Sequence, residues 1–379
     1  MIYLDNGATS YPKPEEVYKA HDYAFRKFGA NPGRGGHTLA RECARVIYKT
    51  REKMAEFINA KDSREISFTS NTTEALNQML LGVIKEGDHV ITSQLEHNSV
   101  WRPLEWLKEN KRIKIDLCKH DEEGFIDIED MERKINKNTK LIIINHCSNV
   151  FGCIQDIEQI GNLAKRKGVY LAVDGAQSLG YEKIDVQNMN IDMLAFAGHK
   201  GLLGPFGVGG MYVKKDVLLE PIKTGGTGSI SESPDMPEQG PDRYESGTMN
   251  TPGIYSLGAS LDYISEKGVD NIKKHKMKLV DKLIKEIGGY VTIYGPKELE
   301  KRGPVVSFNI DDKYSSDVAF ILDTVYGIAV RAGLHCSPLA HKCFNTLEQG
   351  TVRVTPGLFN TEGEIDTLIT AIKEIKGEI

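Results

Sequence analysis

The sequence lacks the features that mark a membrane protein, a disulfide scaffold or a nucleic-acid binder. No apolar run approaches the roughly 20 residues of a membrane span, and the chain opens without a basic segment followed by an apolar one. Six cysteines among 379 residues are too few for a disulfide framework. Acidic and basic residues are interspersed, so the formal charge of −5 gives no basic field for nucleic acid. We therefore expect a cytoplasmic protein with reduced thiols.

The middle of the chain alternates short apolar runs with amphipathic segments, which is typical of a mostly parallel sheet wrapped by helices. The expected strands are residues 65–69, 89–93, 113–117, 141–145, 169–173, 193–197 and 209–213. Asn71 is expected to begin a helix, because Glu74 follows three residues later as in a capping box. The sequence thus predicts an α/β fold.

The pattern changes after this region. Residues 224–242 contain several glycines and three prolines, so they are expected to form a loop. Beyond residue 260 the sequence predicts helix, strand, helix, strand and a final helix from Thr361, enough for a second, smaller α+β domain.

A lysine and an aspartate stand at the ends of two expected strands. Lys200 follows Gly198-His199 in glycine-rich, apolar surroundings, and Asp174 follows the apolar run 169–173. A desolvated lysine has a lowered pKa that suits Schiff-base formation, and an acid can hold the ring nitrogen of pyridoxal phosphate protonated. The alternatives are a solvated surface lysine and an aspartate that caps a turn.

These residues belong to a longer series of motifs. In chain order the others are Leu4-Asp5-Asn6-Gly7-Ala8-Thr9-Ser10, Ser70-Asn71-Thr72-Thr73-Glu74, Leu95-Glu96-His97-Asn98-Ser99, Ser148-Asn149-Val150-Phe151-Gly152, Glu245-Ser246-Gly247-Thr248 and Arg331-Ala332-Gly333-Leu334-His335-Cys336. With this series the chain resembles the class V aminotransferases, and within them the cysteine desulfurases and selenocysteine lyases, nearly from end to end.

The resemblance implies a fold and a division into domains. The expected fold is that of a fold-type I pyridoxal-phosphate enzyme, with a mostly parallel seven-stranded sheet in a large domain at residues 16–258. Residues 1–15 and 259–379 would form the smaller α+β domain.

The resemblance also implies how pyridoxal 5'-phosphate is held. Lys200 would bind it covalently, Asp174 would pair with the pyridinium, and Gln177 would donate to the phenolic oxygen. His97, which on its own could be a core histidine, would stack on the ring and transfer protons.

The resemblance implies that Thr72, Thr73 and His199 bind the phosphate, and backbone N–H groups at the start of the Thr73 helix would add to this, since helix N-termini favour anions. Thr248 would reach the phosphate from the partner subunit, which implies a homodimer. Two positions depart from the family pattern: Asn71 replaces a frequent glycine, and Ala197 replaces a serine or threonine that binds phosphate in many relatives.

Three further residues are implied to contact the substrate: Ala8, Asn149 and Arg353. Arg353 could be a solvated strand arginine, but its match to the family's carboxylate-binding arginine favours a clamp on an amino acid.

Cys336 aligns with the cysteine that accepts sulfur in relatives, and nearby glycine and proline favour an accessible loop. A packed, inert cysteine is the first alternative. Zinc is the second, because His335, His341 and Cys343 are close in sequence, but no paired close cysteine spacing supports a metal site.

The expected activity is therefore a cysteine desulfurase that forms L-alanine from L-cysteine and leaves a persulfide on Cys336. Selenocysteine lyase, and a class V aminotransferase or lyase for another small amino acid, remain open alternatives. A nucleotide-binding module is a third, suggested only by glycines at 201–210 without a G-x-G-x-x-G pattern. A small sulfur-acceptor protein, as used in iron–sulfur cluster assembly, is the expected partner.

Overall fold

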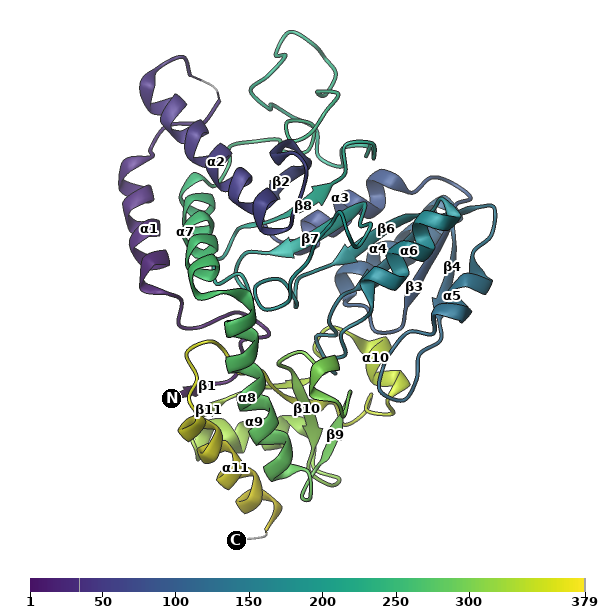
Figure 1. Cartoon of the computed structure of the whole chain (residues 1–379), viewed down its shortest axis with the longest axis vertical. Helices are drawn as coiled ribbons and strands as arrows, with labels where there is room; N and C mark the ends of the chain where they lie inside the picture. The colour runs from purple at the N-terminus through teal and green to yellow at the C-terminus, as the bar shows by residue number, and fades with distance from the viewer. Residues whose placement is uncertain (34, 378–379) are drawn as a thin grey trace.

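The computed structural model describes residues 1–33 and 35–377. Its largest sheet has seven strands in the order β2-β8-β7-β6-β5-β3-β4 (Figure 1). The strands are β2 (Ile66–Thr69), β3 (His89–Ser93), β4 (Lys114–Cys118), β5 (Thr139–Asn145), β6 (Tyr170–Asp174), β7 (Met193–Ala197) and β8 (Gly209–Val213). Strands β3 to β7 pair in parallel, and β8 pairs antiparallel with β7 and β2. All seven expected strands are confirmed, with ends shifted by at most two residues.

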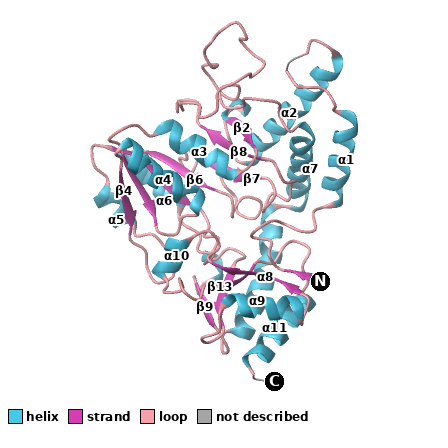
Figure 2. Cartoon of the chain, turned by 180° about the vertical axis from the view of Figure 1, so that it is seen from behind, coloured by secondary structure: helices cyan, strands magenta, loops and turns pink. Residues whose placement is uncertain are grey.

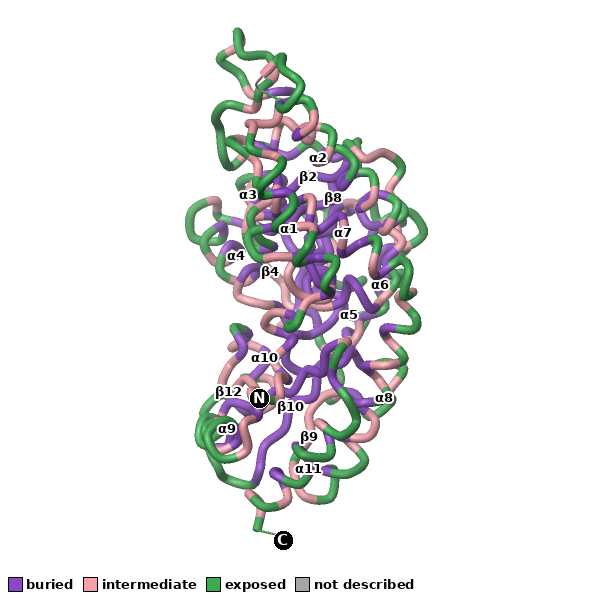
Figure 3. The backbone as a smooth tube through the Cα atoms, turned by 90° about the vertical axis from the view of Figure 1, so that its left-hand side faces the viewer, coloured by how far each residue is buried: buried purple, intermediate pink, exposed green. Residues whose placement is uncertain are grey.

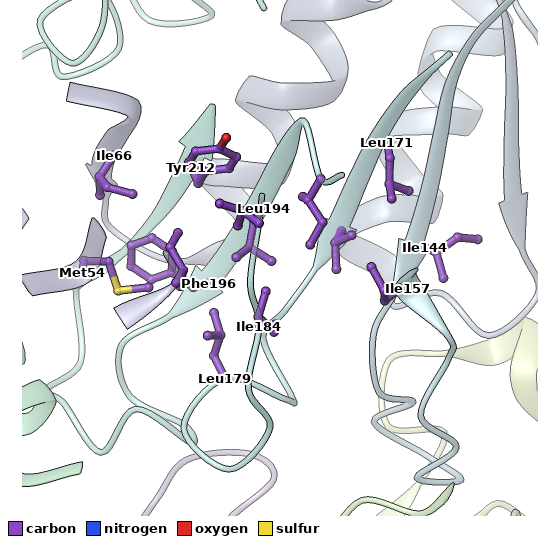
Figure 4. Close-up of a cluster of buried hydrophobic side chains, with 14 of the residues drawn as sticks. Met54, Ile66, Ile144, Ile157, Leu171, Leu179, Ile184, Leu194, Phe196 and Tyr212 are labelled. Carbon is purple, nitrogen blue, oxygen red and sulfur yellow. The ribbon is translucent and has the colours of Figure 1, made fainter. Parts of the chain in front are cut away.

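Helices cover both faces of this sheet. They are α1 (Glu15–Lys27), α2 (Thr38–Phe57), η1 (Ser63–Glu65), α3 (Thr72–Val83), α4 (Asn98–Lys111), α5 (Ile128–Lys134), α6 (Ile157–Lys167) and α7 (Thr251–Lys267). Successive strand residues point to opposite faces, so Ile144 joins the core beneath α2, α6 and α7 (Figure 4), while Ile143 joins the core beneath α3 and α4. Burial on both faces explains why the central strands β5, β6 and β7 read as apolar runs, whereas the edge strand β4 is partly exposed and alternates.

The start of α3 matters for the site. The Asn71 side chain accepts a hydrogen bond of 2.9 Å from the Glu74 backbone N–H, so Asn71 is the N-cap, as expected. The expected capping box is only half formed, because Glu74 accepts from the N–H of Ser70. The cap leaves Thr72 and Thr73 in the first turn, at the positive end of the helix dipole.

The C-terminal third builds a second body, at the bottom of Figure 2. Its elements are α8 (Val269–Ile287), β9 (Thr292–Tyr294), η2 (Leu299–Lys301), β10 (Val306–Asn309), α9 (Ser315–Thr324), β11 (Ile328–Ala329), β12 (Arg331–Gly333), α10 (Pro338–Cys343), β13 (Thr351–Val354) and α11 (Glu362–Lys376). An antiparallel sheet has the order β12-β13-β10-β9.

The N-terminus joins this second body. Strand β1 (Ile2–Tyr3) pairs in parallel with β11, and Leu4 is buried in a third core with Leu279, Phe308 and Leu368. Buried segments run through both bodies in Figure 3. The division at residues 16–258 against 1–15 and 259–379 stays a proposal, and Leu261, Ile264 and Ile272 still pack in the core of the large sheet beyond its second boundary.

Residues 224–242 form the long loop that was expected, without helix or strand, and it projects from the top of the molecule in Figure 1. No helix within residues 1–33 and 35–377 is long and apolar enough to cross a membrane.

Candidate active site

One pocket lies at the carboxyl ends of β5, β6 and β7 and beside the start of α3, where parallel α/β sheets bind ligands. It brings together eight of the residues predicted from the sequence: Thr72, Thr73, His97, Asn149, Asp174, Gln177, His199 and Lys200. Ala8, Thr248, Cys336 and Arg353 are not among the described residues that line it.

Lys200 follows β7, and its amine is surrounded by protein although the residue is partly accessible. This burial lowers the pKa of the amine to about 8, Asp174 acts in the opposite direction, and Arg353 and Arg331 lower the pKa further. A lysine that is partly neutral near pH 8 can attack a carbonyl group.

Asp174 is the last residue of β6 and is buried. Its Oδ1 accepts a hydrogen bond of 2.9 Å from the backbone N–H of Ala176. Burial raises the pKa of the carboxyl, whereas the Ala176 N–H and the charge of Lys200 lower it. A buried carboxyl in this position is suited to pair with a protonated ring nitrogen.

His97 is the N-cap of α4, and its Nδ1 accepts from the Ser99 N–H at 3.1 Å. Because Nδ1 is an acceptor, a neutral ring carries its proton on Nε2. Burial lowers the pKa of His97 to about 4, with a further contribution from the charge of Lys200. The ring is therefore neutral at pH 7. Sequence reasoning missed Ser99, although the Glu96-His97-Asn98-Ser99 motif contains it.

Part of the pocket lining has the character of an anion site. Thr72 and Thr73 lie in the first turn of α3, where backbone N–H groups lack helical partners. Nδ1 of His199 is buried and has no hydrogen-bond partner among the described residues. Ala197, the departure from the family pattern, is buried at the end of β7.

The N-terminal segment crosses the site next to Ala8. Nε2 of Gln177 donates to the carbonyl of Gly7 at 2.9 Å, a contact that sequence reasoning did not predict. A Cβ atom on Gly7 would lie 3.1 Å from Cζ of Arg353, so glycine allows this segment to lie against the arginine. The segment thereby connects Gln177 with Arg353.

Arg353 projects from β13 and is 1% exposed. Its Nη2 lies 2.8 Å from Oδ1 of Asp5, its Nη1 donates to the carbonyl of Asn149 at 2.9 Å, and its Nε has no partner among the described residues. Asn149 in turn donates to the carbonyl of His335 at 2.7 Å. The solvated-arginine alternative is therefore wrong. The pairing with Asp5 was not predicted from sequence.

Cys336 is exposed on a turn after β12. Its Sγ accepts from Nη2 of Arg331 at 3.4 Å, and its carbonyl accepts from the N–H of Asn98 at 2.8 Å, next to His97. It lines an open pocket that shares Thr73, His97 and Ser99 with the pocket of Lys200. The packed-cysteine alternative is therefore wrong.

The residues of the zinc alternative have other partners. His335 is buried, and its Nε2 lies 3.1 Å from the Thr351 carbonyl, while Nδ1 of His341 lies 2.8 Å from Oγ1 of Thr346. In the described part of the chain, no group of three or more His, Cys, Asp or Glu side chains could hold a metal ion.

Thr248 is exposed and lies outside the pocket of Lys200 in its own chain. Its Oγ1 accepts a hydrogen bond of 3.0 Å from Asn31, and it lines a separate pocket together with Asn250. A role for Thr248 in a partner's site stays a prediction.

Comparison with known proteins assigns the fold and the family. A probable cysteine desulfurase of Pyrococcus abyssi is 37% identical over 99% of this chain and 94% of that protein. A probable cysteine desulfurase of Methanothermobacter thermautotrophicus is 38% identical over 99% of this chain and 95% of that protein. The solved apo structure of cysteine desulfurase from Thermococcus onnurineus NA1 superimposes with a TM-score of 0.94 at 36% identity, covering 100% of this chain and 95% of the other.

The fold is therefore that of the fold-type I pyridoxal-phosphate enzymes, as expected. The sequence profile of the class V aminotransferases matches residues 2–368. Since this match covers nearly the whole chain, the protein belongs to the class V aminotransferase family.

Proposed function

We propose that this protein is a pyridoxal-phosphate-dependent cysteine desulfurase that converts L-cysteine to L-alanine and takes up the sulfur as a persulfide on Cys336. The observation that carries the proposal is the exposed Cys336 thiol on a turn whose pocket adjoins that of Lys200. The names of the relatives support the same activity.

Class V aminotransferases use pyridoxal phosphate, and the residues of this pocket fit that group. Lys200 supplies the amine, Asp174 supplies the acid for the ring nitrogen, and Gln177 and His97 line the same pocket. The unpaired Nδ1 of His199 lines the same pocket as the first turn of α3, so both can serve the phosphate. When bound, the cofactor withdraws electrons from the α-carbon of an amino acid.

Substrate binding falls to Arg353 and the segment around Ala8. Arg353 would bind the substrate carboxylate by a charge-assisted hydrogen bond, and Asp5 and Asn149 keep its guanidinium in place. Lys200 moves protons at the substrate carbons, since its pKa of about 8 lets it act as both base and acid near neutral pH.

The sulfur leaves by attack of Cys336. A bond forms between Sγ of Cys336 and the substrate sulfur, the substrate C–S bond breaks, and its electron pair stays on carbon. That carbon takes up a proton, for which Lys200 is the available group because the His97 ring is already neutral, and alanine results. Arg331 holds the Cys336 sulfur by its hydrogen bond at 3.4 Å.

The protein is further proposed to work as a homodimer, with Thr248 completing the partner's phosphate site, and to pass sulfur to a small acceptor protein. Selenocysteine remains an alternative substrate, because a selenol leaves more readily than a thiol.

Alanine formation tests the proposed function. The purified holoenzyme is incubated with cysteine, with selenocysteine, or with alanine and a 2-oxo acid, each with and without an added thiol. We expect alanine and sulfide from cysteine, with turnover increased by the thiol. A variant in the other accessible cysteine, Cys343→Ser, should behave as the wild type. Amino-group transfer without alanine formation from cysteine would instead establish an aminotransferase.

A further inference from the structure

Glu96, the residue before His97, is a buried carboxyl group that the proposed reaction does not use. It is 1% exposed, and its Oε1 accepts hydrogen bonds from Oγ of Ser93 at 2.7 Å and from the backbone N–H of Asn145 at 3.1 Å. These contacts join the segment that carries His97 to the carboxyl ends of β3 and β5.

Two buried oxygen atoms of Glu96 and Asn145 have no hydrogen-bond donor within residues 1–33 and 35–377. Oε2 of Glu96 and Oδ1 of Asn145 are both buried and have no partner among the described residues. Turning the Asn145 amide around does not remedy this, because its Nδ2 already donates to the Leu95 carbonyl at 2.5 Å. A proton on Oε2 would remove the negative charge that this buried oxygen, without a partner in the described part of the chain, would otherwise share.

The surrounding charges also disfavour an ionised Glu96. Asp174, paired with Asn145 across β5 and β6, is the charged group that acts on it, and its sign is the same. The histidines that follow Glu96 and Asn145, His97 and His146, are neutral at pH 7, because burial lowers the pKa of each to about 4. Burial raises the pKa of Glu96 to about 8, although its two hydrogen bonds act in the opposite direction.

We propose that Glu96 is a neutral acid in the folded protein and acts as a positioning residue, which fixes His97 without adding a second negative charge next to Asp174. The consequence for catalysis rests on the proposed function: Asp174 alone then sets the charge that faces the ring nitrogen. The protonation state itself does not depend on the reaction.

Thermal unfolding of the full chain as a function of pH, with and without pyridoxal phosphate, tests the protonation state. Glu96 keeps its proton in the folded state between pH 5 and 8 but loses it on unfolding, so the contribution of Glu96 to wild-type stability falls with rising pH through this window. Glu96→Gln lacks this dependence. We expect its Tm to rise relative to the wild type by at least about 3 °C from pH 5 to pH 8.

The exposed Glu86, on the loop between α3 and β3, provides the matched control. The difference in Tm between Glu86→Gln and the wild type should be constant over the same range. A constant difference for Glu96→Gln, or failure of this neutral variant to fold at pH 6, would show that the ionised carboxylate is required and would overturn the proposal.

The positioning role has its own readout in the holoenzyme. Glu96→Gln should keep cofactor affinity and alanine formation within about threefold of the wild type and should retain activity above pH 8, where wild-type Glu96 ionises. Glu96→Ala should lose at least tenfold in kcat, because it leaves the Ser93 and Asn145 donors without an acceptor. If Glu96→Gln and Glu96→Ala lose the same share of activity, the positioning role is wrong, even if the pH dependence of stability is as expected. In that case the wild type still forms alanine while both variants do not, and the pH dependence of stability is unchanged. If instead the proposed function is wrong, the wild type itself forms no alanine.

Discussion

The sulfur of Cys336 lies 3.4 Å from Nη2 of Arg331, five residues earlier in the chain. The turn between them brings the side chain back toward β12, and His335 and Cys336 both have left-handed backbones, with φ of 49° and 60°. This conformation costs about 1–2 kcal/mol for each residue that is not glycine. Hydrogen bonds from Asn98 to the Cys336 carbonyl and from Asn149 to the His335 carbonyl offset the cost. The thiol is thus held in a defined place next to the pocket of Lys200.

We predict that Lys200 alone binds the cofactor covalently. Borohydride reduction followed by peptide mapping should label Lys200, and Lys200→Ala should abolish turnover. Lys13 is a demanding control, because burial also lowers its pKa to about 8 and its Nζ lies near the His199 carbonyl. Lys13→Ala should still be labelled on Lys200. Label on any other lysine would overturn the assignment.

The pKa of Lys200 also predicts how fast the apoenzyme takes up pyridoxal phosphate. The neutral amine is the nucleophile, so the rate should rise about tenfold per pH unit below pH 8 and level off above it. Stopped-flow absorbance between pH 6 and 10 measures this. A rate that keeps rising to pH 10 would show that the amine has the pKa of an ordinary lysine.

Arg353→Ala is expected to weaken cysteine binding more than it slows chemistry. Loss of a charge-assisted hydrogen bond costs about 1.5–3 kcal/mol, which corresponds to a rise in KM of about 10- to 150-fold. Asp5→Asn keeps the guanidinium and should change KM less than about fivefold. Steady-state kinetics on folded variants, checked by thermal unfolding, decides the point. An unchanged KM in Arg353→Ala would exclude the carboxylate contact.

The role of Thr248 can be tested by mixing two inactive variants. If Thr248 acts in the partner's site, a heterodimer of Lys200→Ala and Thr248→Ala contains one site with both residues intact. Activity should therefore reappear after the two proteins are unfolded and refolded together. If Thr248 acts within its own subunit, each site keeps one defect and the mixture stays inactive. Sedimentation should show a dimer throughout.

Arg51 and Glu245 form a buried, bidentate ion pair with N–O distances of 2.7 and 2.8 Å. Glu245 stands three residues before Thr248. Arg51→Met should destabilise the fold by about 3–5 kcal/mol in urea unfolding, because the Glu245 carboxylate stays buried without a compensating positive charge and, among the described residues, keeps only the hydrogen bond from the Phe68 N–H. The exposed pair of Arg26 and Asp22 is the control, and Asp22→Ala should change the unfolding midpoint little. Equal losses of stability in the two variants would contradict the claim that breaking the buried pair costs more than breaking the exposed one.

Sequence reasoning succeeded where the signal is local. The central strands β6 and β7 are apolar runs because both of their faces are buried. Asp174 and Lys200 stand at the ends of these two runs, so their meeting at one sheet edge could be predicted. The contact of Asp5 with Arg353 could not be predicted, since the two residues are 348 positions apart and meet through the pairing of β1 with β11 and the bridge between Asp5 and Thr355. The same holds for the link between Glu96 and Asn145, which depends on the order of the strands.

The central claim is that the sulfur of cysteine is transferred to Cys336, and mass spectrometry of the Cys336 peptide tests it most directly. Wild-type enzyme incubated with cysteine and no added thiol should carry one extra sulfur atom on this peptide and on no other cysteine. Cys336→Ala should bind the cofactor normally but form alanine from cysteine at least 100-fold more slowly. An unmodified Cys336 peptide, together with wild-type alanine formation by Cys336→Ala, would contradict the account.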